Sequence, residues 1–144
     1  MSRAHRIGIL FATLGLLVST YLLAMRIAGV LPPCAPPPFD GCGKVETSVW
    51  SSVGPIPVAA IGVIGSAVLL LASIVHARTK REGALALWLF AGLVGAAAEI
   101  GFISIQEFLI HAWCIWCLFY GTTVFICAAA AISASRAYAR STRA

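Results

Sequence analysis

The sequence predicts an all-α membrane protein, a bundle of four transmembrane helices with an outward loop that contains a short amphipathic half-helix. Two observations predict this fold class. Of the 144 residues, 60% are hydrophobic and 10% are charged, whereas soluble domains are about one-quarter charged. Four long stretches are also nearly free of charge, and a helix needs roughly 20 apolar residues to cross a bilayer. These stretches must be helical in hydrocarbon, because every backbone polar group there has to be paired internally.

The expected spans follow from these stretches, in a single domain that comprises residues 1–144. They lie at about residues 7–27, 57–76, 83–105 and 112–134. Arg3 and Arg6 precede the first span, which raises the alternative of a cleaved signal peptide. The apolar run is longer than in a usual signal peptide, and its removal would leave three spans. We therefore expect it to remain as a transmembrane helix.

The basic residues indicate the orientation of the chain. Eight of the ten lie at the termini or in the turn between the second and third spans, and only Arg26 and Lys44 lie in or beside the loop at residues 29–56. Cytoplasmic segments carry the excess of Lys and Arg. We therefore expect cytoplasmic termini, with the loop and the turn at residues 106–111 facing outward. This placement argues against a nucleic-acid partner.

The outward loop changes character halfway along. Residues 31–42 are dense in proline, which predicts an extended chain, because proline fixes φ and lacks a backbone donor. Four apolar residues then recur at helical spacing: Val45, Val49, Trp50 and Val53. They predict a short amphipathic helix that lies on the bilayer surface. Residues 54–57, Gly-Pro-Ile-Pro, end this helix and start the second span.

Four of the five cysteines are expected on the outward side. Cys114 and Cys117 form a C-x-x-C motif at the start of the fourth span, and Cys34 and Cys42 lie in the loop. One helical turn brings the first two sulfurs together, and the positive helix N-terminus lowers the pKa of the leading thiol. We therefore expect a redox pair in which Cys114 is the more exposed, more reactive thiol and Cys117 the deeper one.

Other interpretations of the cysteines remain open. The four outward thiolates could bind zinc or another soft metal in a non-catalytic membrane protein. Cys34 and Cys42 could also form a purely structural disulfide in the loop. Cys127 lies about 15 Å further along the fourth span than Cys117. It is out of reach of the other four, and we interpret it as a small, lipid-facing apolar residue.

An ordered set of residues runs from the first span to the fourth. It comprises Cys34 and Cys42 with seven residues between them, Val45, Ser48, Gly54-Pro-Ile-Pro57, Gly62, and Trp113-Cys-Ile-Trp-Cys117. This set resembles the vitamin K epoxide reductase family, in its bacterial disulfide-forming branch. The resemblance implies a quinone, either ubiquinone or menaquinone, held within the helices as electron acceptor. It further implies a bacterial inner (plasma) membrane location and a thioredoxin-like partner outside that membrane.

The resemblance also implies roles for individual residues. Cys34 would react with the partner protein, Cys42 would exchange with Cys114, and Cys117 would face the quinone. Ser48 matches a Ser or Thr that supports the loop and borders the quinone site in the family. The implied activity is a quinone-dependent thiol oxidoreductase that reoxidises the partner and so supports disulfide bond formation.

Two departures from the family concern the substrate. The chain contains no asparagine, whereas the vertebrate enzymes use one in the second span to bind the vitamin K head group. Those enzymes also have a tyrosine four residues after the C-x-x-C motif, where this chain has Gly121. We expect the adjacent Tyr120 to point elsewhere on the helix. The expected substrate is therefore a quinone and not an epoxide.

Glu99 is an ionisable residue inside the third span, and such residues are functional candidates. It would contact the quinone or supply a proton to it, or it would instead be an interfacial carboxylate that reaches water or pairs with Arg26. Gln106 lies seven residues further on, so we expect it on the same helix face.

Aromatic residues and one histidine surround the C-x-x-C motif. We expect Trp116 and Phe119 to form walls of the quinone pocket, because flat rings pack against a flat ligand. Trp50, Trp113 and Trp116 are also placed to form an aromatic belt at the membrane interface. His111 would either stabilise the Cys114 thiolate or lie at the interface.

Overall fold

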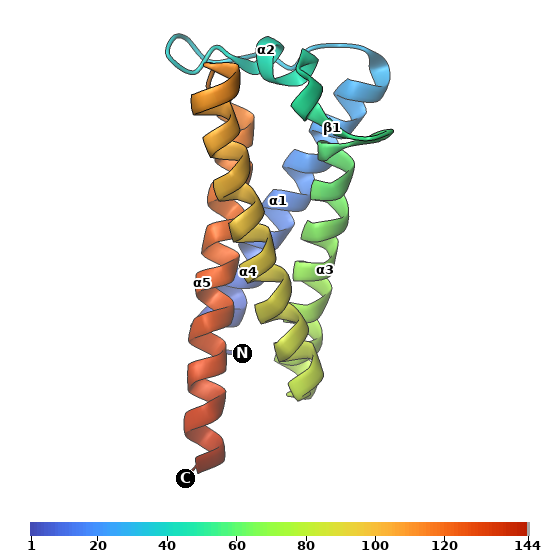
Figure 1. Ribbon diagram of the computed structural model, residues 1–144. Helices are drawn as coiled ribbons and strands as arrows, with labels where there is room; N and C mark the ends of the chain where they lie inside the picture. Colours follow the sequence, from blue (N-terminus) through green and yellow to red (C-terminus); the bar gives the residue numbers. More distant parts are fainter. Residues whose placement is uncertain (144) are drawn as a thin grey trace.

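The computed structural model describes residues 1–143 and contains four long helices. These are α1 (Arg3–Ala28), α3 (Val58–Thr79), α4 (Glu82–Ile105) and α5 (Ile115–Arg143), shown in Figure 1. Each is long and apolar enough to cross a membrane, with α4 counted together with its continuation to Ile110. The expected all-α, multi-pass membrane fold is confirmed.

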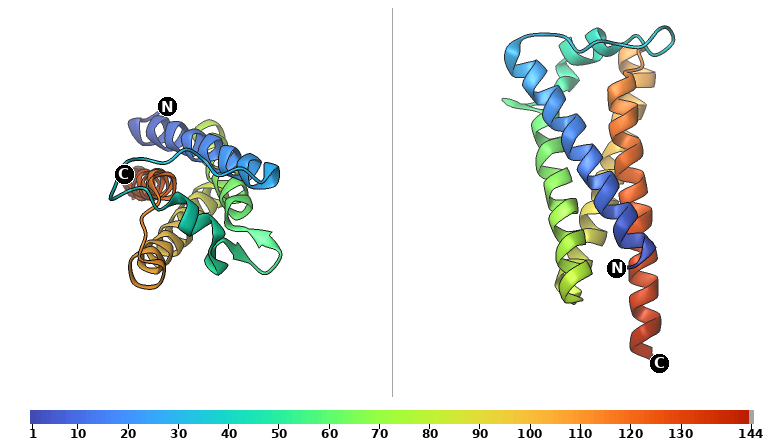
Figure 2. Two further views of the ribbon diagram at one scale, coloured as in Figure 1. Left: turned by 90° about the horizontal axis from the view of Figure 1, so that it is seen from above. Right: turned by 180° about the vertical axis from the view of Figure 1, so that it is seen from behind.

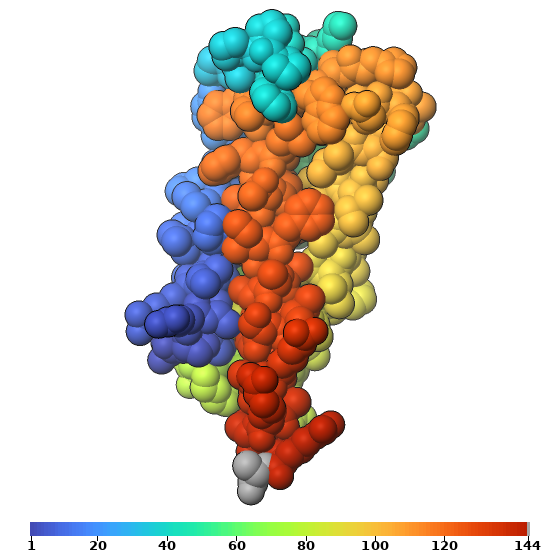
Figure 3. Space-filling view, turned by 90° about the vertical axis from the view of Figure 1, so that its left-hand side faces the viewer, coloured from blue at the N-terminus to red at the C-terminus, as the bar shows by residue number. Residues whose placement is uncertain are grey.

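The four helices pack around one another in a ring. α1 contacts α3 and α5, and α4 contacts the same two helices. α1 crosses the bundle at a clear tilt, as both views of Figure 2 show. The loop lies across one end of the bundle, which we call the cysteine end. Both termini and the turn between α3 and α4 lie towards the other end, which we call the terminal end, and α5 extends furthest there (Figures 1 and 3).

A core of small residues lies around the indole ring of Trp88. Trp88 is fully buried, and its neighbours in the core include Ala12, Ala72, Ala131 and Cys127. Small side chains let helix backbones approach closely, which favours helix association in a bilayer. Cys127 is 1% exposed, so it is a small apolar residue as expected, but it faces the bundle interior and not lipid.

The ends of the spans differ from the expected ones where the chain reaches the cysteine end. α4 continues without a break into η2, a turn of π-helix at Gln106–Ile110, where the sequence indicated only a turn. α5 begins at Ile115 and not at residue 112. The backbone just before it pairs with the loop, since the Gly41 N–H donates to the Trp113 carbonyl at 2.9 Å. α5 then continues beyond residue 134 to Arg143.

The loop between α1 and α3 is only partly helical. Residues 30–41 contain no helix, as the prolines predicted, and the chain turns at residues 36–39. The remaining elements are α2 (Cys42–Thr47), η1 (Val49–Ser51), β1 (Ser52–Val53) and β2 (Ile56–Pro57). The expected amphipathic helix at residues 45–53 is therefore wrong in extent. Ser48 has an extended backbone and ends α2, and Val49 is 85% exposed.

Arg26 fixes this loop to the end of α1. Its guanidinium donates to the Glu46 carboxylate at 2.9 Å, to the Glu46 carbonyl at 2.7 Å, and to the hydroxyls of Ser51 and Ser52. The side chain of Arg26 thus contacts all three elements, α2, η1 and β1. The suggested pairing of Arg26 with Glu99 is wrong, because Arg26 pairs with Glu46 instead.

Candidate active site at the cysteine end

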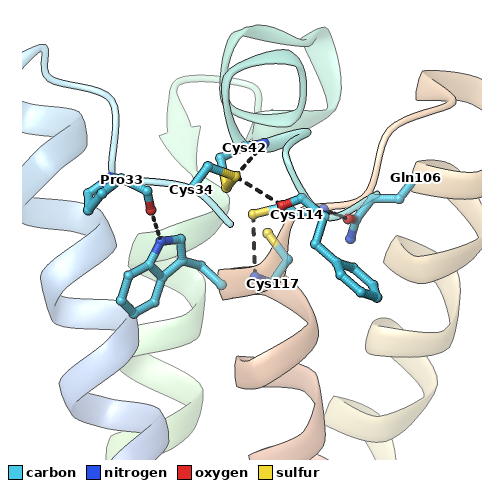
Figure 4. Close-up of a disulfide and its surroundings, with 8 residues drawn as sticks. Pro33, Cys34, Cys42, Gln106, Cys114 and Cys117 are labelled. Atoms are coloured by element: carbon cyan, nitrogen blue, oxygen red, sulfur yellow. Dashed lines mark hydrogen bonds between the residues drawn. A yellow bond between two sulfur atoms is a disulfide. The ribbon is translucent and has the colours of Figure 1, made fainter. Parts of the chain in front are cut away.

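A disulfide joins Cys34 and Cys42 in the loop, with the two sulfurs 2.00 Å apart (Figure 4). Its two members differ in accessibility: Cys34 is exposed, whereas Cys42 is 2% exposed at the start of α2. A thiol from another protein could therefore reach Cys34 without moving the loop. In this oxidation state the two loop sulfurs are bonded to each other, so only Cys114 and Cys117 remain as free thiols at this end.

The loop lies directly against the residues that precede α5. Asp40 forms an isolated β-bridge with Cys114, beside the hydrogen bond from Gly41 to Trp113. A Cβ atom at Gly41 would lie 2.7 Å from Ala112 Cβ and 2.8 Å from the backbone of Trp113. Real Cβ atoms do not approach that closely, so only glycine fits here. This contact places Cys42, the next residue, beside Cys114 (Figure 4).

Cys114 precedes the first turn of α5 and acts as its cap. Its carbonyl accepts from the Leu118 N–H at 3.0 Å, and its sulfur accepts from the Cys117 N–H at 3.4 Å. The hydrogen bond with the Cys117 side chain, helped by the backbone N–H groups of Cys117 and Trp116, outweighs burial and lowers the pKa of Cys114 to about 7. A thiol with this pKa is about half thiolate at pH 7, and the thiolate is the attacking species in disulfide exchange.

The relative exposure of the two helix cysteines is the reverse of the expected one. Cys114 is 4% exposed because the loop covers it, whereas Cys117 is half-buried. Cys117 opens onto a cavity within the bundle. The sequence could not reveal this, because helix position alone does not show what covers the first residue of a helix.

The cavity beside Cys117 receives side chains from every long helix and from the loop, and its space of about 750 Å³ includes the solvent region at its opening. Most of its lining is apolar and includes Leu22, Val58, Ala59, Phe102, Ile105 and Ile110. Polar atoms come from a few side chains, among them Ser19, Glu99, Gln106 and Tyr120. Glu99 and Gln106 thus share a face, as their spacing predicted. An apolar cavity with a few polar groups is typical of sites for small organic ligands.

The two aromatic residues expected to line the cavity lie elsewhere. The Trp116 ring packs against Tyr21 at 5.1 Å between centroids, and its Nε1 donates to the Pro33 carbonyl at 2.7 Å. Trp116 therefore holds the proline-rich part of the loop. Phe119 is 46% exposed on the outside of the bundle.

Tyr120 lines the cavity, contrary to the expectation that it points elsewhere. Its hydroxyl donates to the Gly62 carbonyl at 3.1 Å and accepts from the Ser66 hydroxyl at 3.3 Å. Residues three apart on a helix share a face. The spacing of Tyr120 from Cys117 was therefore a signal that could have identified it.

Gln106 positions Cys114 and was not recognised from the sequence. It is 3% exposed, and its Oε1 accepts from the Cys114 N–H at 2.8 Å.

Ser48 lies outside the cavity, where its hydroxyl donates to the Val45 carbonyl at 2.7 Å and supports the end of α2. His111 is exposed, with φ 53°, at the reversal between η2 and α5.

Comparison with known proteins agrees with this arrangement. No curated protein matches the chain significantly. A family model described as the vitamin K epoxide reductase family matches residues 6–132, which include the loop, all of α3 and α4, and most of α1 and α5. Members of that family are oxidoreductases that generally use quinones. Because the match covers most of the 144 residues, the chain belongs to the vitamin K epoxide reductase family.

Proposed function

We propose that the protein is a quinone-dependent thiol oxidoreductase of the bacterial disulfide-forming branch, which reoxidises a thioredoxin-like protein outside the inner (plasma) membrane. One observation carries the proposal. The four cysteines form a series from an exposed sulfur at Cys34, through buried Cys42 and Cys114, to Cys117 at the cavity. Such a series suits electron transfer from a protein outside the membrane to a ligand inside it.

The first step is thiol–disulfide exchange with the partner. A partner thiolate attacks Cys34, forms a mixed disulfide with it, and releases Cys42 as a thiolate. The second partner thiol then displaces Cys34, so the partner leaves oxidised and the loop pair is left reduced. The exposure of Cys34 supports its role as the sulfur that is attacked.

The second step transfers the electrons to the helix pair. The Cys42 thiolate attacks Cys114 of an oxidised C-x-x-C pair and releases Cys117, after which Cys34 displaces Cys114 and restores the loop disulfide. The lowered pKa of Cys114 makes it a good leaving group in this exchange. The present oxidation state, with the loop pair bonded and the helix pair free, corresponds to the end of this step.

The third step regenerates the helix pair at the cavity. The residues present fit a quinone, because the walls are mostly apolar and a few polar side chains line them together with Cys117. A bound quinone would supply the acceptor for two electrons and two protons. Cys117 would face it, and Glu99 and Tyr120 would provide the polar contacts.

The proposed orientation follows the basic residues. Those at residues 3, 6, 78, 80, 81, 136, 140 and 143 belong to the terminal end, away from the cysteines. An excess of basic residues marks the cytoplasmic side. The cysteine end would then face the compartment in which disulfides persist.

Thiol alkylation in cells, with and without quinone synthesis, tests the proposal. With quinone present, the loop pair should be found mainly as a disulfide. Without quinone, all four cysteines should accumulate as alkylated thiols, because the electrons have no acceptor. Cysteines that stay oxidised in quinone-free cells would contradict the proposed electron path.

A further inference from the structure

Glu99 lies inside a membrane-spanning helix, and its carboxyl group has no ionic partner among the described residues. Among residues 1–143 the salt bridge that forms is between Arg26 and Glu46, which leaves the Glu99 carboxyl group unpaired. Glu99 and Cys117 line the same cavity. Ionisable residues in spans are costly and so commonly have a function.

The carboxyl group of Glu99 lies against the same face of α5 as Cys117. A Cβ atom at Gly121 would lie 2.8 Å from Glu99 Oε2, so the carboxyl group fills the space that a larger residue 121 would need. Gly121 is four residues after Cys117, and residues four apart are stacked on one helix face. The acid is therefore held one turn of α5 from the thiol.

Other polar groups at the cavity already form hydrogen bonds or ion pairs with protein groups. The Tyr120 hydroxyl donates its proton to the Gly62 carbonyl at 3.1 Å, and the Glu46 carboxylate pairs with Arg26 at 2.9 Å. The Gln106 amide has no acidic proton, and its oxygen holds the Cys114 N–H. Glu99 is the acid at this cavity whose proton is not committed to another group.

We propose, on the basis of the function proposed above, that Glu99 carries a proton from the helix thiols to the bound quinone. When Cys114 and Cys117 form their disulfide, two electrons pass to the quinone together with two protons, one from the Cys117 S–H group and one that Cys114 gives up to water when it ionises. Glu99 gives its carboxyl proton to one quinone oxygen and takes up the proton released by Cys117. The second thiol proton reaches the other oxygen through water, so atoms and charge balance.

Stopped-flow reduction of a short-chain benzoquinone by the purified, pre-reduced full chain tests this role. Glu99→Gln keeps the size of the side chain but cannot transfer a proton. It should slow a single turnover about 100-fold and flatten its pH profile, and Glu99→Asp should recover part of the rate. Gly121→Ala should also slow the reaction, because the added methyl group displaces the carboxyl group without removing it. Glu107→Gln, at an exposed position outside the cavity lining, is the matched control and should behave as wild type.

Two further readouts do not depend on turnover. Infrared difference spectra on addition of the benzoquinone should show a shifted carboxyl C=O band in wild type and none in Glu99→Gln. Disulfide exchange between the loop and helix pairs, followed by alkylation without quinone, should be unchanged in Glu99→Gln.

The possible outcomes separate the two proposals. If wild type reduces the benzoquinone and Glu99→Gln matches it in rate, pH profile and infrared spectrum, the role of Glu99 is wrong while the proposed function stands. If wild type transfers no electrons to any quinone, both are wrong. If Glu99→Gln also blocks exchange between the cysteine pairs, Glu99 has a structural role and the proton-carrier proposal is wrong.

Discussion

The cysteine end and the terminal end of the bundle are stabilised in different ways. At the terminal end, small residues such as Ala131 pack around the fully buried Trp88. At the cysteine end, the helices line the open cavity beside Cys117. Hydrogen bonds donated by Arg26 and Trp116 hold the covering loop, and Gln106 accepts from the Cys114 N–H. Close packing of small side chains suits stability in a bilayer. The cysteine end leaves room for a ligand, and hydrogen bonds orient the candidate catalytic cysteines there.

Polar groups at the terminal end make the contrast clearer. His5 Nε2 and His76 Nδ1 are hydrogen-bonded at 2.9 Å, and the Ser2 hydroxyl lies 2.6 Å from His5 Nδ1. Both histidines are buried. This pair joins α1 to α3 within a packed interior, whereas the polar groups near Cys117 line a cavity. Polar residues therefore have structural roles at one end and candidate chemical roles at the other.

Gly41→Ala should have the largest effect on electron transfer of the changes that keep every cysteine. The added Cβ would collide with Ala112 and the Trp113 backbone and push Cys42 away from Cys114. A displacement of about 1 Å at reacting groups costs on the order of 100-fold in rate, and we expect that slowing of exchange between the two cysteine pairs. Quenched alkylation with mass spectrometry measures the rate in purified protein without quinone.

Gly43→Ala is the matched control for this change. Gly43 lies in α2, two residues after Gly41, and its Cβ would make only an ordinary contact, 3.6 Å from Leu31 Cδ1. The control should exchange at the wild-type rate. Equal rates for the two variants would show that the close approach at Gly41 does not position Cys42.

The reactivity of Cys114 should depend on pH with a midpoint near 7. Because its pKa is lowered to about 7, the thiolate fraction, and with it the rate of alkylation by iodoacetamide, should rise as the pH passes through 7 and level off above it. In Cys117→Ala the hydrogen bond from the Cys117 side chain is lost, so the midpoint should move up towards the ordinary value of about 8.5. Tandem mass spectrometry distinguishes the two thiols. An unshifted midpoint would mean that Cys117 does not stabilise the thiolate.

Trp88→Ala should have the smallest effect on electron transfer while lowering stability. Removing a fully buried indole costs about 3–5 kcal/mol, so the melting temperature in detergent should fall. The rate of exchange between the cysteine pairs in the folded fraction should stay at the wild-type value. A large loss of exchange rate at temperatures well below melting would show that the two ends are coupled. It would contradict the claim that packing at the terminal end affects stability but not electron transfer.

The sequence predicted the helices and the grouping of cysteines because both depend on local properties. Long uncharged stretches must become helices in a bilayer, and the spacing of Glu99 from Gln106 follows from helix geometry. The proline-dense residues before Cys42 likewise form no helix, because proline lacks a backbone donor.

The features that the sequence did not predict depend on contacts between distant segments. The burial of Cys114 and the start of α5 at Ile115 result from the loop lying against residues 112–114. The π-helical turn at residues 106–110 ends α4 with Gln106 buried against Cys114, which ideal α-helical spacing does not anticipate. Trp116 was predicted to contact a ligand, but it contacts the loop instead.

Trapping a mixed disulfide in Cys117→Ala tests the proposed electron path most directly. Without Cys117, the Cys114 thiolate has no neighbour to pair with, and it should attack Cys42 in the loop disulfide, leaving Cys34 as a free thiol. Cys127→Ala serves as a control, since that thiol is buried in the core and should take no part. Non-reducing peptide mapping after mild oxidation should find a Cys42–Cys114 disulfide in Cys117→Ala and none in Cys127→Ala. An intact Cys34–Cys42 disulfide with Cys114 still free would contradict the transfer of electrons between the loop and helix pairs.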